Sequence, residues 1–593
     1  MDEKLHAMRH SAAHVLAAAV AELYPGAQFG VGPVVDDGFY YDILTPQPVT
    51  EDDFGKIEQK MREIINRGEE FRREDMPIGD AITFFQERNQ PFKVALLTAL
   101  KEKGTTAIRP EEAGDIAGAD SASVYYTGAF VDLCRGPHVA NSKEIGAFKL
   151  AKLAGAYWRG DDKNPQLQRV YGYCFATKED LDAHLFMLEE AKKRDHRKLG
   201  KELGLFTFSE LVGPGLPLWT PKGTMMRELL NDYVWALRKK HGYQKVTIPH
   251  ITKKDLYETS GHWAKYAADL FKVTTREGHE FAMKPMNCPH HAQIFDSEPR
   301  SYRDMPVRYC ETTMVYRDEQ SGELSGLSRV LSITQDDAHV FCRLNQVREE
   351  AEKVWDIIET FYKTFGFNLV PRLSRRDAKQ AADYMGEPAD WDQAEAALKE
   401  ILDAHKVEWI DGPGEAAFYG PKIDFMAKDS LGRTWQVATI QLDFNQPRNF
   451  GLTCVNEQGE KEPVVMIHCA IMGSLERCMS VLIEHYAGAF PLWLAPEQIR
   501  LATVSDDFVP FAKELQGNLA QAGLRVSVDD SSEKLGKKIR NAAMSKIPWT
   551  VVIGAKEAEG GDIKVNVFGQ EEDLVIPQAD FVAKAADAGK MPV

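Results

Sequence analysis

Hydrophobic and polar positions follow different patterns along the chain, and the changes divide it into four segments. Residues 1–178 mix helical patterns with short strand patterns such as QRVYGYCFA. Residues 179–203 include LDAHLFMLEEAKKRDHRKLGKEL, with apolar residues at helical spacing on one side and basic residues on the other. A plain surface helix has the same pattern, but the place between two larger segments favours a helical linker.

The two remaining segments differ in how their strands are arranged. Residues 204–496 contain strand-like runs punctuated by glycine and proline, with long helices before and after: VTIPHI, VRYCETTMVYR, RVLSITQDDAHVF, TWQVATIQLDF and EPVVMIHCAIMG. These runs predict an antiparallel sheet flanked by helices. Residues 497–593 alternate strand, helix and strand, which predicts a small α/β domain around a mixed sheet. The predicted fold class is therefore α+β with several domains.

Composition narrows the class of protein. Of 593 residues, 44% are hydrophobic and 27% charged, an ordinary balance for a soluble globular chain of several domains. There is no run of about eighteen apolar residues, so we expect no membrane span. The N-terminal MDEKLHAMRHSAAHVLAAAV lacks a cleavage site and contains histidines, unlike a secretory signal. Eight thinly spread cysteines suit a reducing compartment, and we expect a cytoplasmic protein.

The formal net charge of −17 describes only the far field of the protein. Phosphate contacts need local groups of Lys and Arg, and three such clusters occur, at 192–198, 238–240 and 533–540. Each cluster is equally typical of a solvated helix face. Net charge therefore neither supports nor excludes an RNA partner.

The third segment holds the first candidate chemistry. In VYRDE, Arg317 and Glu319 are two apart, and on a strand they would share one face. The guanidinium can hold a phosphate or carboxylate, and the glutamate can accept from an amine, although a lone R-x-E is more often a surface ion pair. Gly473 and Arg477 lie at a predicted strand-to-helix transition in IMGSLERCMSVLIEHY, and Pro249 follows a predicted long helix.

Two groups of residues have side chains of the metal-ligand type. Cys288, His339 and His468 each lie in one of the strand-rich motifs, and one thiolate with two imidazoles suits zinc with an open coordination position. Taken singly, each is more typical of a buried core residue. In the first segment His10 and His14 share a helical face, and CRGPH adds two more ligand-type side chains, Cys134 and His138. From spacing alone those four indicate a tetrahedral zinc site.

The order of Pro249, the R-x-E motif and the Gly473–Arg477 motif resembles the three signature motifs of class II aminoacyl-tRNA synthetases. Further motifs resemble the threonyl-tRNA synthetase family over nearly the whole chain: HSAAHVLA, VDLCRGPH, YWRGD, RDHRKLGKELGLF, MKPMNCPHH, TQDDAHVFC and EKLGKKIR. The resemblance implies ATP-dependent ligation of L-threonine to tRNA(Thr) through threonyl-adenylate, and hydrolytic editing of seryl-tRNA(Thr). It makes 1–178 an editing domain, 179–203 a linker, 204–496 the catalytic domain and 497–593 an anticodon-binding domain.

The resemblance also implies roles for single residues. Arg317 and Arg477 are the expected catalytic residues, one Zn²⁺ per chain is expected at Cys288, His339 and His468, and Mg²⁺ is expected with ATP. The expected ATP contacts are Arg317, Glu319, Arg329, Gln436, Ser474 and Arg477. The expected threonine contacts are Met286, Gln335, Asp337, Tyr419 and Gln441. The expected editing residues are His10, His14, Lys93, Asp132, Cys134 and His138, acting without a bound metal, so the zinc site indicated by spacing is the alternative.

Several expectations mark departures and competing hypotheses. The family usually has R-x-R-x-F before QDDAH, and here Leu331 and Ile333 replace the second arginine and the aromatic ring. A ubiquitin-like domain common in the family is expected to be absent, and a homodimer is expected. One competing hypothesis is a synthetase-like RNA-binding or regulatory protein without catalysis, which predicts loss of motif residues that are present. Another is a zinc hydrolase at HSAAH, but Ser11 stands where H-E-x-x-H has its glutamate.

Overall fold

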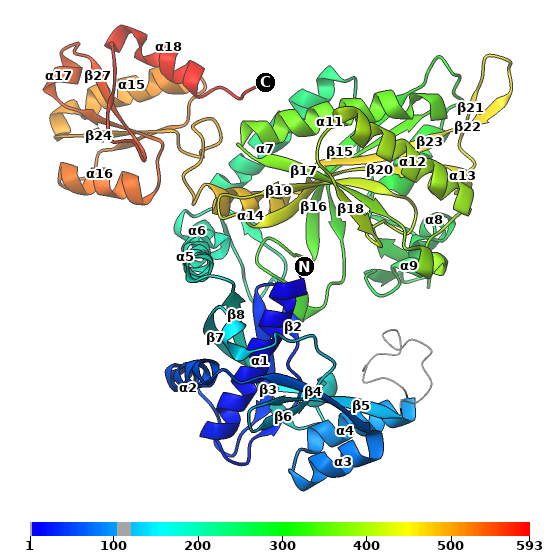
Figure 1. The fold of residues 1–593 in the computed structure, drawn as a ribbon. Helices are drawn as coiled ribbons and strands as arrows, with labels where there is room; N and C mark the ends of the chain where they lie inside the picture. Colours follow the sequence, from blue (N-terminus) through cyan, green and yellow to red (C-terminus); the bar gives the residue numbers. More distant parts are fainter. Residues whose placement is uncertain (1–2, 104–119) are drawn as a thin grey trace. The chain divides into compact units, whose positions relative to one another are not determined.

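The computed structural model describes residues 3–103 and 120–593. Figure 1 shows the ribbon, which divides into two compact units, Met1–Glu189 and Glu190–Val593, considered separately below. Within the described ranges, none of the helices combines the length and the apolar character needed to cross a membrane.

Helix α1 (Glu3–Leu23) forms the centre of the first unit, because its alanine-rich middle is buried on every side. It packs against α2 (Phe54–Arg67) and against two sheets. The first sheet has the order β1-β3-β8-β7, with β2 paired to β3. The bounds are β1 Gln28–Phe29, β2 Val34–Val35, β3 Gly38–Leu44, β7 Ala147–Tyr157 and β8 Gln166–Phe175, and β8 is the predicted strand in QRVYGYCFA.

The second sheet of this unit carries the chain to the motif CRGPH. Its strands run antiparallel in the order β4-β5-β6, and two helices cover it through a small core around Phe85 and Leu97. The bounds are β4 Phe71–Pro77, β5 Ser121–Thr127, β6 Phe130–Leu133, α3 Ile78–Glu87 and α4 Pro91–Lys103. The arrangement of helices with two sheets confirms the predicted α+β class of this segment.

The predicted helical linker consists of two helices, α5 (Lys178–Arg194) and α6 (His196–Glu202). They are separated at Asp195, whose carboxylate accepts a 2.8 Å hydrogen bond from the backbone N–H of Arg197. Such an N-cap satisfies a backbone donor at the start of α6 and favours a new helix at this point.

The second unit is built around an eight-stranded sheet with the order β11-β15-β16-β23-β20-β19-β17-β18. The pairings from β15 to β17 are antiparallel, as predicted, whereas the outermost strands β11 and β18 pair in parallel with their neighbours. The bounds are β11 Gln244–Lys245, β15 Val307–Tyr316, β16 Ser332–Cys342, β17 Asn368–Arg375, β18 Ile410–Pro413, β19 Lys422–Lys428, β20 Thr434–Asp443 and β23 Val465–Ser474.

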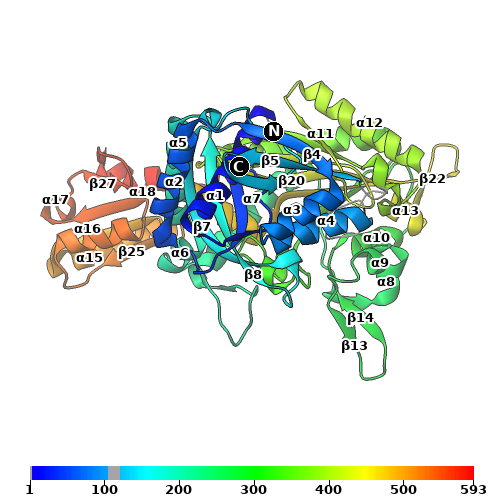
Figure 2. The ribbon, with the colours of Figure 1, turned by 60° about the horizontal axis from the view of Figure 1, so that its bottom comes forward.

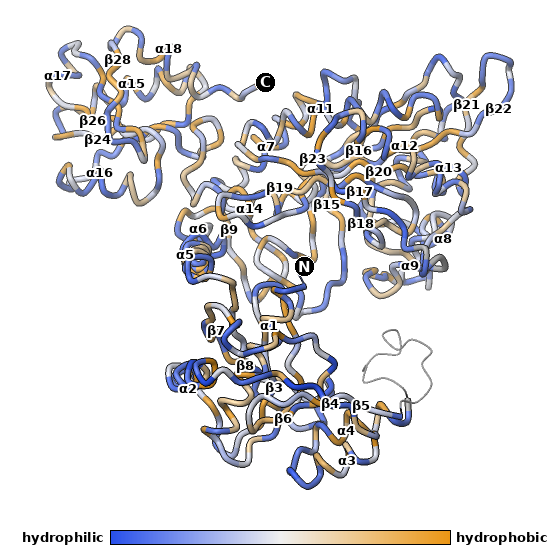
Figure 3. Tube along the Cα trace, viewed as in Figure 1, coloured by the Kyte–Doolittle hydropathy of each residue, from blue (hydrophilic) through white to orange (hydrophobic). Residues whose placement is uncertain are grey.

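Helices flank this sheet and bury their apolar faces on it. Helix α11 (Val347–Thr364) turns Val354, Trp355, Ile358 and Phe361 into the core and its charged residues outward. Figure 3 shows hydrophobic residues gathered along the central strands of the sheet, while the loop between β21 and β22 is largely hydrophilic. The other helices and short strands here are α7 Pro221–Lys240, α12 Pro388–His405, α13 Asn445–Asn449, α14 Leu475–His485, β9 Phe206–Thr207, β10 Leu218–Trp219, β21 Thr453–Val455 and β22 Lys461–Pro463.

The run VTIPHI is mostly irregular, so its prediction as a strand was wrong. Only its last residue belongs to a strand, β12 (Ile251–Lys253), because Pro249 has no N–H to donate to a ladder. This strand joins a separate sheet, β12-β14-β13, which Figure 2 shows beside helices α8 and α9. The bounds are β13 Lys272–Thr274, β14 Glu280–Met283, α8 Lys254–Thr259, α9 His262–Lys265 and α10 Cys288–Asp296.

The C-terminal segment forms a mixed five-stranded sheet, β25-β24-β26-β27-β28, as predicted. Strands β25, β24 and β26 are parallel, and β27 and β28 complete the sheet antiparallel. The bounds are β24 Ile499–Thr503, β25 Val526–Asp529, β26 Trp549–Ile553, β27 Ile563–Val567, β28 Leu574–Ile576, α15 Val509–Gln521, α16 Leu535–Met544, α17 Ala555–Ala558 and α18 Gln578–Ala588.

Two residues of the predicted basic clusters are neither solvated nor free for RNA. Arg238 is buried and lies 2.6 Å from Asp336. Lys538 is also buried, and its ammonium donates 3.0 Å hydrogen bonds to the carbonyl oxygens of Thr503 and Asp529. Both belong to the interior of their domains and hold elements together.

Candidate active sites and metal centre

The three predicted metal ligands of the second unit lie together. Cys288 begins α10, and His339 on β16 is paired directly with His468 on β23. Their ligand atoms all lie within 4.8 Å of one another, and His339 Nε2 is 3.1 Å from His468 Nδ1. All three side chains are buried. A donor set of one sulfur and two imidazole nitrogens at this spacing is typical of zinc.

The surrounding residues orient these ligands. Asp443 Oδ2 lies 2.9 Å from His468 Nε2, so this nitrogen carries the hydrogen and Nδ1 presents its lone pair to the other ligands. Gln446 Nε2 donates to Cys288 Sγ at 3.4 Å. Burial raises the pKa of the Cys288 thiol well above its usual range, so a thiolate here requires a neighbouring cation. Sequence reasoning did not single out Asp443 or Gln446, since nothing in their local sequence marks them.

Three of the five predicted threonine contacts lie beside the same centre. Asp337 lies two residues before His339 on the same strand, and Gln441 is paired directly with His468. The Tyr419 ring lies 5.1 Å from that of His468. Of the other two, Met286 places its Sδ 3.0 Å from His262 Nε2, and Gln335 has a buried amide oxygen without a hydrogen-bond partner in the described structure.

One further histidine belongs to this pocket and was missed. His262 is buried at the start of α9, with Nε2 3.0 Å from Met286 Sδ and 3.9 Å from Cys288 Sγ. Burial, with the charge of Arg317 among the further causes, lowers the pKa of His262 to about 3, so the imidazole is neutral at physiological pH. The motif SGHW gives no spacing pattern that indicates this position.

The R-x-E motif lies just beyond a strand, so the prediction that both side chains project from a strand face was wrong. Strand β15 ends at Tyr316, and the Arg317 N–H donates to the Leu331 carbonyl at 3.0 Å, which closes a loop. Arg317 Nε is buried without a hydrogen-bond partner anywhere in residues 3–103 or 120–593. An unpaired buried guanidinium nitrogen is well suited to an anionic ligand.

Two more arginines complete a positively charged region. Arg477, in the first turn of α14, donates from Nε to the Ser328 carbonyl at 3.2 Å. Burial, followed by the charges of Arg317 and Arg329, lowers the pKa of Arg477 from its ordinary value. Arg329 Nη2 lies 2.6 Å from Glu319 Oε2, so the Glu319 carboxylate has a cationic partner. Three close guanidinium groups provide the positive charge that a polyphosphate requires.

The remaining predicted nucleotide contacts line the same part of the sheet. Ser474 Oγ caps α14 by accepting from the Arg477 N–H at 3.2 Å. Gln436 donates to Asp424 at 2.8 Å, and with Arg477 it lines a small cavity of about 20 Å³. Leu331, at the departure from the family pattern, packs against Gly215 and donates to its carbonyl at 2.9 Å. Its side chain makes an apolar contact at this point in the loop.

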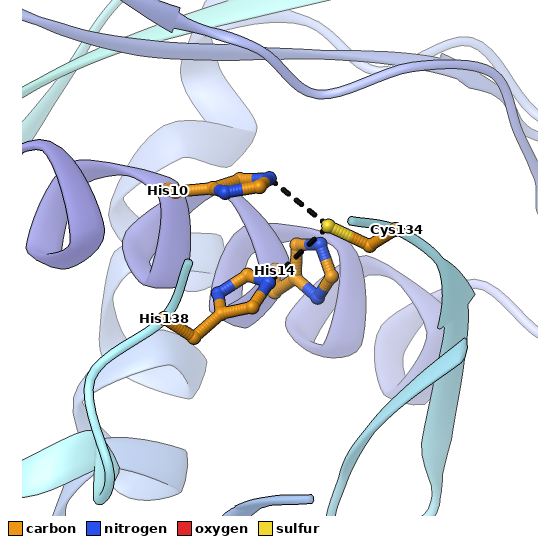
Figure 4. A group of neighbouring side chains, drawn as sticks. All are labelled: His10, His14, Cys134 and His138. Carbon is orange, nitrogen blue, oxygen red and sulfur yellow. Dashed lines mark hydrogen bonds between the residues drawn. The ribbon is translucent and has the colours of Figure 1, made fainter. Parts of the chain in front are cut away.

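The predicted N-terminal site is also assembled. His10 and His14 project from one face of α1 toward CRGPH, as Figure 4 shows. Cys134 Sγ lies 3.2 Å from His10 Nε2 and 3.3 Å from His138 Nε2. Gly136, at φ 75°, turns the chain between Cys134 and His138, and a Cβ there would lie 2.5 Å from the Tyr125 hydroxyl.

A buried charged network supports this cluster. Asp132 pairs with Lys93, accepts from the Tyr41 hydroxyl, and lies 3.3 Å from His14 Nε2. Tyr41 was not predicted, because its strand is distant in sequence from CRGPH. Burial lowers the pKa of His14 well below its ordinary value and raises that of Cys134 to about 12. The imidazole and the thiol are therefore both neutral at physiological pH.

Two adjoining cavities open onto the N-terminal cluster. One of about 490 Å³ is lined by the histidines of α1, Lys93, Asp132 and Cys134. The other, of about 890 Å³, shares Cys134 and Arg135 with the first and contains further arginines. Its basic side chains are Arg73, Arg135, Arg159 and Arg169. Asp42 and Asp75 line the same cavity and pair with Arg169 and Arg73, so the cluster borders a space of mixed charge that is large enough for a polar ligand.

The antiparallel sheet, the R-x-E loop and the arginine at the strand-to-helix junction define a class II aminoacyl-tRNA synthetase. The class II core family for glycine, histidine, proline, serine and threonine matches residues 271–486, and an anticodon-binding domain family matches 498–587. The second additional domain of threonyl- and alanyl-tRNA synthetases matches residues 122–171.

Relatives specify the family. A threonine--tRNA ligase of Parabacteroides distasonis is 45% identical over 98% of this chain and 87% of its own length. One of Rubrobacter xylanophilus is 47% identical over 96% of this chain and 86% of its own. The chain belongs to the threonyl-tRNA synthetase family. Among solved structures, the RNA-binding domain of threonyl-tRNA synthetase from Cryptosporidium parvum matches with a TM-score of 0.64, 36% identity and 67% coverage of this chain and 98% of that one.

Proposed function

We propose that the second unit ligates L-threonine to tRNA(Thr) with ATP, through threonyl-adenylate, around a zinc centre. The same chain hydrolyses mischarged seryl-tRNA(Thr) in its N-terminal module. The observation that carries the proposal is the buried Cys288–His339–His468 set together with Arg317, whose Nε is buried without a hydrogen-bond partner in the described residues. The charges of His468 and of Arg317 both lower the pKa of His262, after burial, so both groups lie near this histidine. Metal ligands and anion-binding arginines around the same histidine suit an amino acid with a polar side chain and a nucleotide.

The donor set fits one zinc per chain. Three protein ligands leave a coordination position open, and Asp443 fixes the ring of His468. When bound, zinc supplies a Lewis acid for the amine and the side-chain hydroxyl of threonine. An apolar pocket alone separates threonine from valine by only about a hundredfold, because the two are nearly isosteric. A hydroxyl that must bind a metal excludes valine far more strongly.

The arginines position the reacting groups. Arg317 holds the α-phosphate and the threonine carboxylate, since its Nε has no other partner in the described chain. The Ser328 carbonyl accepts from Nε of Arg477, and within the described residues the two terminal nitrogens have no hydrogen bond, so they can hold the departing pyrophosphate. Mg²⁺ accompanies ATP. The remaining nucleotide contacts proposed are Glu319, Arg329, Gln436 and Ser474, and the threonine contacts are Met286, Gln335, Asp337, Tyr419 and Gln441.

Editing follows from a limit of the metal centre. Serine presents the same amine and hydroxyl and lacks only a methyl group, which is worth about 1–3 kcal/mol. We assign the hydrolysis to His10, His14, Lys93, Asp132, Cys134 and His138 without a resident metal. The thiol of Cys134 has one proton and faces His10 Nε2 and His138 Nε2, so one imidazole lone pair stays available to accept a proton from water.

Assembly and domain limits are part of the same proposal. The domains are 1–178 for editing, 179–203 for the linker, 204–496 for catalysis and 497–593 for anticodon binding, and each matched family segment falls inside one of them. A cytoplasmic homodimer is proposed, with an interface near the start of α7. Exposed apolar side chains immediately before α7 support that location: Phe208, Leu211, Val212 and Leu218.

The test of the synthetic function is ATP–pyrophosphate exchange with a panel of amino acids. Threonine should support the fastest exchange, serine a slower one, and valine a rate near background although it matches threonine in shape. Exchange with valine within tenfold of that with threonine would contradict recognition of the hydroxyl by a metal. If an amino acid other than threonine supported exchange and threonine did not, the proposed substrate would be refuted.

A further inference from the structure

We propose that His196 is a positioning residue of the synthetic site, which ties the loop between β15 and β16 (residues 317–331) to helix α14 and so holds two ATP-binding arginines in place. The inference rests on the proposed role of that loop in binding ATP. His196 begins α6, which sequence analysis assigned to the linker. Figure 1 shows α6 next to α14, the two helices are in contact, and Leu199 of α6 belongs to the core of the second unit.

The imidazole of His196 is buried and uses both ring nitrogens. Nδ1 lies 2.6 Å from Oε1 of Glu484 on α14, which is an acceptor, so the ring hydrogen is on Nδ1. Nε2 therefore presents a lone pair, and it accepts from the backbone N–H of Leu327 at 3.0 Å. One side chain thus joins the helix to the loop, with a donor on one side and an acceptor on the other.

Leu327 lies at the tip of a tight turn within the loop. The Ser325 N–H donates to the Arg329 carbonyl at 3.1 Å, and the Arg329 N–H donates to the Ser325 carbonyl at 3.3 Å. Gly326, between them, has a φ of 51°, and a Cβ there would clash with His196 Nε2. A glycine is needed both for this backbone conformation and for the close approach of the imidazole. The turn is therefore shaped around His196.

The residues that follow Leu327 are those proposed to act on the nucleotide. Arg329 is a proposed ATP contact, and the carbonyl of Ser328 accepts from Arg477 Nε at 3.2 Å. The Ser328 hydroxyl also lies 3.1 Å from that of Ser480, three residues after Arg477 on α14. Movement of the tip would shift Arg329 and withdraw the carbonyl that orients Arg477.

Glu484 is a fixed anchor for the tie. Its Oε1 also accepts from the His196 backbone N–H at 3.1 Å, and its Oε2 lies 2.6 Å from Arg433 Nη2. Burial would raise the pKa of Glu484, but the hydrogen bonds from His196 and the charge of Arg433 outweigh it and lower the pKa below its ordinary value. The carboxylate is therefore charged at physiological pH, and it holds His196 while Nε2 holds the loop.

Two substitutions separate the roles of the two nitrogens. The amide of His196→Asn replaces Nδ1 as a donor to Glu484 and leaves no acceptor for the Leu327 N–H. The longer side chain of His196→Gln places its carbonyl oxygen near the position of Nε2 and keeps the acceptor. A buried donor left without its acceptor typically costs a factor of about five or more.

The assay is ATP–pyrophosphate exchange with the full-length chain. His196→Asn should raise the KM for ATP at least about fivefold, and His196→Gln should stay within about threefold of the parent. The KM for threonine and the bound zinc should change by less than about twofold in both variants, because the zinc ligands and the proposed threonine contacts lie outside residues 325–329. A general loss of structure would alter all of these quantities together.

His405→Asn is the matched control. His405 Nε2 also pairs with a carboxylate, Glu352 at 2.7 Å, but it lies on α12. The control should leave both KM values near those of the parent. The inference is overturned if His196→Asn leaves the KM for ATP within twofold of the parent, if it raises both KM values alike, or if His196→Gln is impaired as much as His196→Asn.

Amide hydrogen exchange tests the tie in the parent itself, so the inference stays falsifiable even if a variant does not fold. The peptide spanning 325–331 should be protected without ATP, and His196→Asn should remove much of that protection. Rapid exchange of this peptide in the parent would overturn the inference. If the parent catalysed no pyrophosphate exchange with any amino acid, the proposed function would fail, while hydrogen exchange would still decide whether His196 holds the loop.

Discussion

Replacing Asp443 with asparagine tests how the protein prepares the synthetic metal centre. The Asp443 carboxylate is fully buried and accepts from His468 Nε2 at 2.9 Å, from the Asn445 N–H at 2.7 Å and from Gln446 Nε2 at 3.0 Å. In Asp443→Asn the carbonyl oxygen keeps the backbone bond. The amide NH₂ then faces the Nε2–H of His468, and two donors cannot bond.

The conflict can be relieved only at the expense of the metal. If the hydrogen of His468 shifts from Nε2 to Nδ1, then Nδ1, which faces Cys288 and His339, no longer has a lone pair for the metal. A hydrogen bond to a charged group contributes about 1.5–3 kcal/mol, which corresponds to roughly 10- to 150-fold weaker zinc binding. Measured losses on removing such second-shell partners are of similar size, about 10- to 100-fold.

The assay is competition for zinc between the protein and a chromophoric chelator, with threonine-dependent exchange measured at low and at saturating free zinc. Asp443→Asn should bind zinc at least tenfold more weakly, and excess zinc should restore much of the exchange activity. Asp429→Asn is a control, because Asp429 is buried but pairs with Arg433 and Trp435. Zinc affinity in Asp443→Asn within twofold of the parent would refute the reasoning.

Four further predictions concern the separate sites. Cys288→Ser should lose zinc, measured by elemental analysis, and should lose threonine activation, while deacylation of seryl-tRNA(Thr) continues. Loss of zinc together with loss of deacylation would indicate misfolding. Burial lowers the pKa of His14 and of His138 below the ordinary value of 6.5, so both imidazoles should stay neutral as the pH falls. The rate of metal-free deacylation, measured between pH 8 and 5.5, should therefore show no titration midpoint near 6.5. Deletion from Glu497 should spare adenylate formation by exchange and abolish aminoacylation. Alanine at the exposed Lys534, Lys537 and Arg540 should raise the KM for tRNA and reduce its salt dependence, and unchanged values would remove them from the RNA surface.

The sequence analysis predicted a shared site for three residues that are far apart in the sequence, and the structure brings them together. Cys288, His339 and His468 were identified by residue type and by resemblance, and the β16–β23 pairing brings the two histidines directly opposite each other. Asp443 and Tyr41 were missed because each acts on a partner distant in sequence, and only strand pairing or packing creates the contact. Spacing within a motif does not contain that information.

The errors came from applying a local pattern without its tertiary context. Arg317 and Glu319 were assigned to a strand face, but β15 ends at Tyr316 where the chain turns into the loop before β16. Lys538 was counted with the basic surface of α16, although it is four residues before Ala542 and shares its buried face. Likewise, Arg238 is four residues after Val234 on α7 and shares its buried face.

The central claim is that synthesis and editing occupy different sites, and one double variant tests it most directly. Cys134→Ala with His138→Ala removes two groups of the N-terminal cluster and none of Arg317, Arg477 or the Cys288 set. Threonylation of tRNA(Thr) should stay within about twofold of the parent, while deacylation of purified seryl-tRNA(Thr) falls by at least about 100-fold, as expected for loss of acid–base groups. Seryl-tRNA(Thr) should then accumulate. Equal deacylation by parent and variant would contradict the account.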